Sequence, residues 1–124
     1  MKAAIVGTRD ITNIDIEKYL IETEEYLSEK ITLVISGGAR GIDTLAEEYA
    51  DKRGIPKQIF LPDYRKHGRG APIIRNISII KAADVIIAFW DGESKGTKFV
   101  INYAKNMDKK VFVYGFHRGP KQAP

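Results

Sequence analysis

The residues best suited to chemistry in this chain lie in the glycine-rich segment SGGARGID, positions 36–43. Gly37 and Gly38 let the backbone turn sharply and let a ligand approach the main chain. The helix expected to begin near Gly41 and Asp43 has unpaired N–H groups with partial positive charge, which suit a phosphate. The same glycines would also serve a plain strand-to-helix turn, and the segment matches neither GxGxxG nor GxxxxGK[ST]. The phosphate hypothesis therefore depends on what lies beside this segment.

Two further loops are expected at the same edge of the fold. GTRD, residues 7–10, follows the first apolar run, and WDGESKGT, residues 90–97, follows the fourth. Because ligands of open α/β sheets bind beyond the carboxyl ends of the strands, these loops should converge with SGGARGID on one cleft. Ser94 and Thr97 could equally cap the helix that begins near Gly96, although capping and anion binding satisfy the same N–H groups.

Basic and amide side chains near these loops fit an anionic ligand. Arg9 follows a strand directly, and its guanidinium could bind a phosphate or form a salt bridge. Arg40 lies inside the glycine-rich segment, where it could bind phosphate or remain solvated. Arg75 and Asn76 occupy the first turns of a helix introduced by Pro72 and are expected to point to the same cleft.

Two other residues have alternative roles. A carboxylate at Asp43 would repel phosphate, so binding of a ribose hydroxyl or compensation of the helix dipole fits it better. Trp90 could stack on a base or plug the core. The predicted ligand-binding residues are Gly7, Thr8, Arg9, Ser36, Gly37, Gly38, Arg40, Gly41, Asp43, Arg75, Asn76, Trp90, Asp91, Ser94, Lys95, Gly96 and Thr97.

Composition narrows the classes of function. The 124 residues include no cysteine, which excludes disulfides, iron–sulfur clusters, thiolate zinc sites and cysteine nucleophiles. Two histidines are too few for a convincing metal cage, so no metal site is predicted. The hydrophobic content is 44%, and no apolar run is long enough to span a bilayer. Without a signal-like N-terminus, these features predict a cytoplasmic protein with no membrane partner.

The net charge of +4 is unevenly distributed along the chain. Residues 64–83 contain five lysines and arginines and no acid, whereas the helix expected over residues 13–30 is rich in glutamate. Positive potential is therefore concentrated in the middle of the chain. A local anion site, a nucleic-acid footprint and an ordinary solvated surface would each produce this pattern.

Hydrophobic periodicity predicts the elements that position the loops. Short runs rich in Ile and Val alternate with segments of helical spacing, which predicts buried strands joined by helices. The expected fold is α/β, a Rossmann-like, doubly wound sheet of five parallel strands in order 3-2-1-4-5 with helices on both faces. Residues 1–117 are predicted to form a single nucleotide-binding domain and residues 118–124 a flexible tail. The strands are expected over residues 2–6, 31–35, 58–61, 84–89 and 110–114.

In order along the chain, GTRD, SGGARGID, GAPIIRN and ADVIIAFWDGESKGT resemble the SLOG superfamily of DNA-processing proteins and LOG phosphoribohydrolases. The resemblance covers nearly the whole chain and is strongest to small stand-alone members. It implies a Rossmann-like domain that recognises nucleotides or nucleotide-derived molecules such as those of the ADP-ribose or NAD type. We therefore expect a sensor or regulatory module that binds a phosphorylated nucleotide or nucleotide-derived molecule of the AMP, ADP-ribose or NAD type. The resemblance also implies a homo-oligomer, expected as a dimer. Because SGGARGID is similar to the DNA-processing proteins, single-stranded nucleic acid is an alternative partner.

One departure from this resemblance concerns catalysis. LOG hydrolases carry PGGxGTxxE after the fourth strand, with a catalytic glutamate, whereas this chain has GTKFV and places Val100 at that position. The departure argues against phosphoribohydrolase activity. N-glycosidic hydrolysis of nucleotides stays an alternative in which Asp91 or Glu93 would supply the carboxylate. No catalytic residue and no cofactor are assigned, and the expected ligand is a nucleotide.

Overall fold

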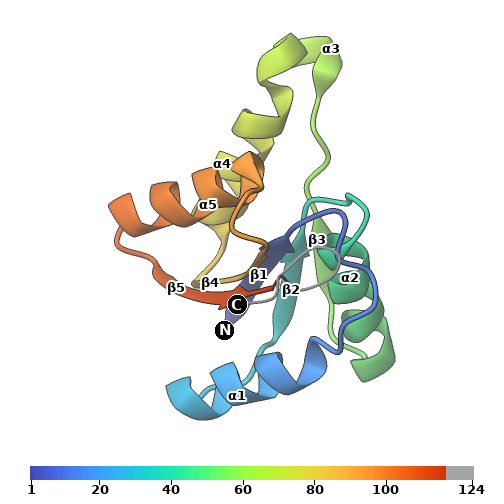
Figure 1. The fold of residues 1–124 in the computed structure, drawn as a ribbon, viewed down its shortest axis with the longest axis vertical. Helices are drawn as coiled ribbons and strands as arrows, with labels where there is room; N and C mark the ends of the chain where they lie inside the picture. The colour runs from blue at the N-terminus through green and yellow to red at the C-terminus, as the bar shows by residue number, and fades with distance from the viewer. Residues whose placement is uncertain (117–124) are drawn as a thin grey trace, which may run out of the picture.

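The computed structural model describes residues 1–116 and contains a parallel sheet of five strands in the order β3-β2-β1-β4-β5 (Figure 1). This arrangement confirms the predicted Rossmann-like α/β fold and its strand order. The predicted tail at residues 118–124 lies outside the described residues. The strands are β1 (Lys2–Gly7), β2 (Leu33–Ser36), β3 (Lys57–Ile59), β4 (Val85–Trp90) and β5 (Lys110–Gly115).

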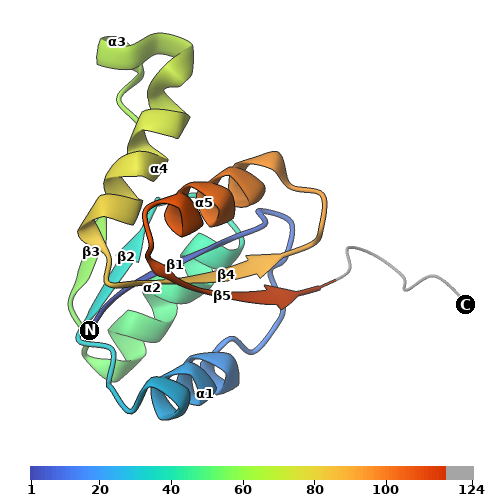
Figure 2. The same cartoon turned by 90° about the vertical axis from the view of Figure 1, so that its left-hand side faces the viewer.

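Helices cover both faces of the sheet, as Figure 2 shows. The helices α1 and α2 pack on one face, and α4 and α5 pack on the other. The short helix α3 and the beginning of α4 stand off from the body of the molecule in both views (Figures 1 and 2). The helices are α1 (Glu17–Leu27), α2 (Ile42–Arg53), α3 (Tyr64–His67), α4 (Ala71–Ala82) and α5 (Lys95–Asn106), with a 3-10 turn at Gly68–Gly70.

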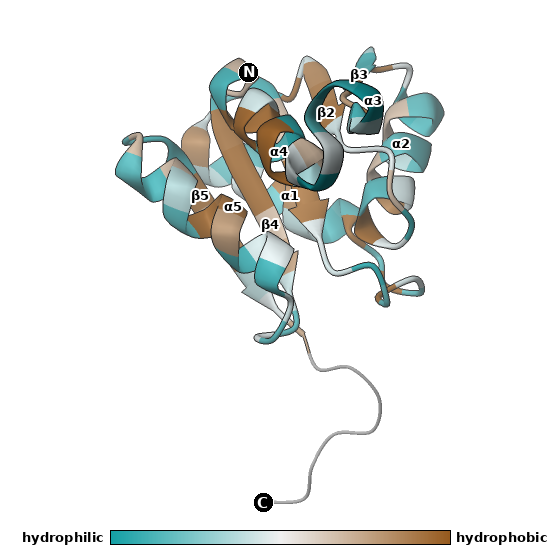
Figure 3. Cartoon of the chain, turned by 90° about the horizontal axis from the view of Figure 1, so that it is seen from above, coloured by the Kyte–Doolittle hydropathy of each residue, from teal (hydrophilic) through white to brown (hydrophobic). Residues whose placement is uncertain are grey.

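The core lies in two layers because successive residues of a strand point to opposite faces. Ala3 and Ile5 of β1 pack with α1 and α2, whereas Ala4 and Val6 pack with α4 and α5. Residues 85–89 of β4 are all buried, as expected for a parallel strand covered on both sides. In Figure 3 the central strands are accordingly brown, and the outer surfaces of the surrounding helices are mostly teal.

Two sequence predictions were wrong in part. The third strand was expected to be buried, but the residues of β3 are exposed. The reason is its position at the edge, where it pairs with β2 and, among the described residues, with no other strand. The helix expected over residues 13–30 is shorter, because Ser28 takes a left-handed conformation (φ 54°) that ends α1 at Leu27.

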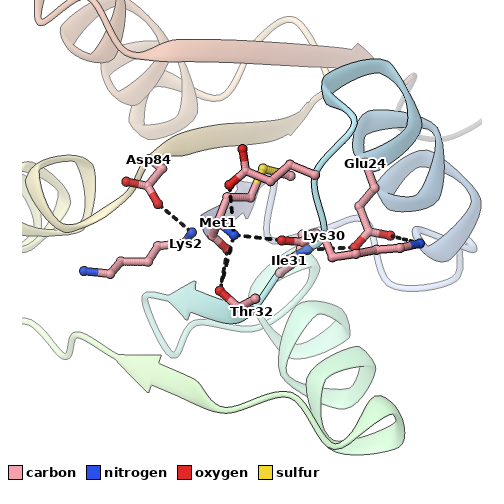
Figure 4. A network of polar contacts seen from close by, with 8 residues as sticks. Met1, Lys2, Glu24, Lys30, Ile31, Thr32 and Asp84 are labelled. Carbon is pink, nitrogen blue, oxygen red and sulfur yellow. Dashed lines mark hydrogen bonds and ion pairs between the residues drawn. The ribbon is translucent and has the colours of Figure 1, made fainter.

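The amino ends of the central strands are tied together by polar contacts (Figure 4). The Met1 ammonium donates to the Lys30 carbonyl at 2.7 Å and to Thr32 Oγ1 at 3.3 Å, beside the start of β2. The Lys2 backbone N–H donates to Asp84 Oδ2 at 2.8 Å, just before β4. Because the strands are parallel, the loops singled out in the sequence leave the opposite, carboxyl edge of the sheet. No helix within residues 1–116 is long and apolar enough to cross a bilayer.

Candidate functional site

A cavity of about 360 Å³ opens at the carboxyl edge of the sheet, where the strand order reverses between β1 and β4. We call it the switch-point cavity. The loops after β1, β2 and β4 converge on it, together with one face of α4. Of the residues predicted from the sequence, Gly7, Thr8, Arg9, Gly37, Arg40, Asp43, Arg75, Asn76, Ser94, Gly96 and Thr97 line this cavity.

Arg75 connects three parts of the cavity wall. From α4, its Nη1 donates to the Gly37 carbonyl at 2.6 Å and to the Phe60 carbonyl at 3.3 Å, and its Nε donates to Asn76 Oδ1 at 2.9 Å. Partial burial lowers the pKa of Arg75 from its ordinary value, while the Asp43 carboxylate opposes that shift. The guanidinium stays charged, because an arginine pKa lies so far above neutrality. Arg75 therefore fixes the glycine-rich loop and also contributes positive charge to the cavity.

Asp43 lies in the first turn of α2 and is 8% exposed. Its Oδ2 accepts a hydrogen bond from the Ala39 N–H at 3.1 Å, so the side chain closes the loop that precedes its own helix. Burial raises the pKa of Asp43, whereas the Ala39 N–H and the Arg75 charge act in the opposite direction. A Cβ at Gly37 would lie 2.8 Å from Arg75 Nη1 and 3.0 Å from Asp43 Oδ2. A larger residue at this position would therefore push the Arg75 guanidinium aside.

Arg9 and Arg40 supply further positive charge from neighbouring loops. Both side chains are exposed, and Arg40 Nη2 lies 3.6 Å from Asp10 Oδ1 in a surface ion pair. Gly41, at φ 76°, packs directly on the backbone of Arg9, where a Cβ would overlap the Arg9 carbonyl group. The conformation and the close approach both require glycine. Gly41 therefore positions Arg9 from behind the cavity wall.

The loop after β4 is shaped by hydrogen bonds of its own residues. Asp91 Oδ1 accepts from the Ser94 N–H at 2.8 Å, and the Asp91 N–H donates to Thr8 Oγ1 at 3.2 Å. Trp90 Nε1 donates to the Ser94 carbonyl at 3.0 Å, and its ring packs against the core beneath α4 and α5. Neither Trp90 nor Asp91 lines the switch-point cavity. These two residues hold the loop that carries Ser94 and Thr97.

The other predicted residues lie around the cavity. Ser36 is buried beneath it and donates to Glu47 Oε2 at 2.8 Å, and Lys95 is exposed at the start of α5. Gly38 lines a neighbouring cavity. Sequence reasoning missed Pro72 and Ile79, which line the wall with Arg75 and Asn76. The spacing 72, 75, 76, 79 is that of one helix face, and that signal could have revealed them.

Two carboxylates line the cavity, and both have partners: Asp10 pairs with Arg40, and Asp43 accepts from the Ala39 N–H. Val100, which stands where LOG hydrolases carry their glutamate, is 3% exposed and forms part of the apolar wall. Asp91 and Glu93 are not among the lining residues. Within residues 1–116, no group of three or more His, Cys, Asp or Glu residues could hold a metal ion. The arrangement suits binding of an anion through arginines and backbone N–H groups.

Comparisons with known proteins give the family. The model of the family DNA recombination-mediator protein A matches residues 1–62, which run from β1 to the segment after β3. The Gene 61 protein of Mycobacterium phage D29 is 33% identical over 89 residues, covering 67% of this chain and 71% of that protein. No solved structure matches the chain. By the family match and this relative, the chain belongs to the DNA recombination-mediator protein A family.

Proposed function

We propose that this protein binds a phosphorylated nucleotide or nucleotide-derived molecule in the switch-point cavity and acts as a sensor or regulatory module. The observation that carries the proposal is the convergence of Arg9, Arg40 and Arg75 with the glycine-rich loop at the carboxyl edge of the sheet. Guanidinium groups bind phosphate oxygens in pairs, and loop and helix N–H groups add fixed partial charge. A nucleotide of the AMP, ADP-ribose or NAD type fits this chemistry.

Each side of the cavity has a distinct part in this proposal. Arg9 is exposed at the start of the loop after β1, and in this proposal it contacts the phosphate. Gly37 and Gly96 bring backbone close to the ligand, near the first turns of α2 and α5. Asn76 and Asp43 offer an amide and a carboxylate that can hydrogen-bond a ribose hydroxyl. Arg75 is engaged with two carbonyl groups and acts mainly through its charge.

We infer that the ligand is bound without being hydrolysed, because Val100 places an apolar side chain on the wall where LOG hydrolases carry their glutamate. Hydrolysis of an N-glycosidic bond needs a carboxylate at the reacting carbon, and Asp91 and Glu93 lie outside the lining. The two carboxylates that do line the cavity, Asp10 and Asp43, are engaged with Arg40 and with the Ala39 N–H. We therefore expect no appreciable release of base from nucleoside monophosphates. Chromatographic detection of adenine formed over many turnovers from AMP, and lost in an Asp91→Asn or Glu93→Gln variant, would overturn this part of the proposal.

Single-stranded DNA is a second candidate ligand. Membership in the DNA recombination-mediator protein A family favours it, as does the basic segment at residues 64–83. Arg65, Lys66 and Arg69 lie on α3 and the following turn, which stand off from the body of the molecule. Contacts between these side chains and the DNA phosphates would bring single-stranded DNA toward the switch-point cavity. The affinity for DNA would then fall steeply as the salt concentration rises.

Calorimetric titration separates the two candidates. AMP, ADP-ribose, NAD and a short single-stranded oligonucleotide are titrated at two salt concentrations. If Arg9 makes a charge-assisted bond to phosphate, Arg9→Ala weakens nucleotide binding by about ten- to a hundredfold. The matched control is Arg53→Ala, which removes a guanidinium from the far end of α2, where it pairs with Glu17. Should the protein bind only the oligonucleotide, and both variants behave like wild type, the nucleotide-pocket proposal is wrong.

A further inference from the structure

A second cavity, of about 310 Å³, lies beside the switch-point cavity on the side of β3. We call it the β3-side cavity. The two cavities share one wall, and the residues of that wall are Arg9, Gly37, Ala39, Arg40 and Arg75. On its other side, the β3-side cavity is lined by Gly38, Leu61 and Pro62. The three arginines therefore lie between two spaces.

The far wall of the β3-side cavity is apolar and firmly held. Leu61 is 70% exposed and, together with Pro62, presents an apolar surface to this cavity. The preceding residue is fixed on both sides, because the Phe60 N–H donates to the Ser36 carbonyl at 2.9 Å and its carbonyl accepts from Arg75. Leu61 lies over the turn at Gly38, where a Cβ would be 2.7 Å from Leu61 Cδ2. The backbone thus holds an exposed apolar surface against the arginine wall.

The two cavities also differ in polarity. The switch-point cavity offers hydrogen-bonding groups from Asp43, Asn76, Ser94 and Thr97 away from the shared wall. On the side away from the shared wall, the β3-side cavity instead presents the apolar side chains of Leu61 and Pro62. A ligand that spans both spaces would meet positive charge in its middle, polar groups at one end and an apolar surface at the other. Bases have flat faces that pack against apolar side chains and stack on guanidinium planes.

We propose that the β3-side cavity is a base-binding subsite, and that the ligand carries a nucleoside on each side of its phosphate. This inference rests on the proposed function. The phosphate lies against the shared arginine wall, one nucleoside occupies the switch-point cavity, and the second base stacks on Leu61 and Pro62. Both a pyrophosphate-linked dinucleotide and a phosphodiester step of a single strand have this chemistry. Leu61 is then a specificity-determining residue that favours dinucleotides over mononucleotides.

The test compares AMP with two dinucleotides, diadenosine diphosphate and 5′-phosphorylated dApdA, by calorimetric titration of the full chain. The tighter-binding dinucleotide is expected to bind at least about tenfold more tightly than AMP, since burial of one base face against an apolar surface has about that effect. Leu61→Ala should remove most of this advantage and change AMP affinity less than about twofold. Leu61→Phe keeps a stacking surface and should retain the advantage. Ile73→Ala is the matched control, because Ile73 is half-exposed on α4 and lines neither cavity.

The outcomes separate this inference from the proposed function. Preference for diadenosine diphosphate identifies a soluble dinucleotide as the ligand, and preference for dApdA identifies a single-strand step; either supports the subsite. If AMP and both dinucleotides bind equally, or if Leu61→Ala and Ile73→Ala have the same effect, the subsite is refuted while the nucleotide proposal stands. If wild type binds none of the three, the proposed function fails and the subsite fails with it.

Discussion

Replacing Arg75 with Met tests whether this side chain holds the site together. Methionine keeps most of the apolar stem but removes the guanidinium that donates to the Gly37 and Phe60 carbonyls. The change therefore disconnects the glycine-rich loop and the segment after β3 from α4. It also leaves the buried Asp43 carboxylate without its cationic neighbour.

The magnitude follows from these contacts. A hydrogen bond from a charged donor contributes about 1.5–3 kcal/mol. The bond to Gly37 is short at 2.6 Å, whereas the bond to Phe60, at 3.3 Å, is long and contributes much less. Arg75 is only partly buried on a cavity wall, so water replaces some of what is lost. We expect the free energy of unfolding to fall by about 2 kcal/mol.

Equilibrium denaturation in urea at neutral pH measures this loss. Arg53→Met is the control, because Arg53 pairs with Glu17 at an exposed site where ion pairs contribute little. Arg75→Met should lower the midpoint clearly more than Arg53→Met, with an unchanged slope. If the two variants lose equally little, Arg75 does not make these bonds in solution. It would then be free to bind a ligand directly, and the division of roles between Arg75 and Arg9 would be wrong.

Two further predictions concern Asp43 and Gly41. Because burial raises the pKa of Asp43 in the folded state, the contribution of Asp43 to stability falls as pH rises from the unfolded-state pKa, about 3.9, through the folded pKa. Asp43→Asn keeps an acceptor for the Ala39 N–H, so its stability relative to wild type should increase between about pH 3 and 7 in urea titrations; a constant difference would contradict this. Gly41→Ala and Gly92→Ala both force alanine into positive φ, at a cost of about 1–3 kcal/mol, and the conformation of Gly41 (φ 76°, ψ −126°) is one that side chains rarely adopt. Gly41→Ala also clashes with the Arg9 backbone, whereas a Cβ at Gly92 meets nothing within 4 Å, so Gly41→Ala should be destabilised by at least about 1 kcal/mol more; equal losses in denaturation curves would refute the packing argument.

The strand order and the convergence of the loops could be predicted because both depend on local patterns. Alternation of apolar runs with helical spacing leaves few topologies, and parallel strands place the following loops at one edge. The exposure of β3 was missed although two signals were present: the expected order places the third strand at an edge, and Lys57 and Gln58 are polar. The apolar residues that follow, from Ile59 to Leu61, outweighed these signals.

The roles of individual site residues were harder to predict than their location. Arg75 was expected to point to the cleft, and Trp90 either to stack on a base or to plug the core; in the structure Arg75 Nη1 and Trp90 Nε1 donate to backbone carbonyls. Leu61 lies in an apolar run that was expected to be buried, and so it gave no sign of lining a cavity. In each case the role of the side chain depends on a contact with a residue distant in the sequence or on the exact path of a loop. Residue type alone does not predict such contacts.

The strand order also has a consequence for how the chain folds during synthesis. β1 pairs with β2 on one side, but on the other side Ala3 and Gly7 pair with Val85 and Phe89 of β4, about 80 residues later. One side of the central strand therefore stays open until most of the chain has left the ribosome, and contacts of such long range slow folding. The segment that matches the family model, residues 1–62, contains β1 but not β4. Residues 1–62 therefore cannot complete the pairing of the central strand β1 until β4 has been synthesised.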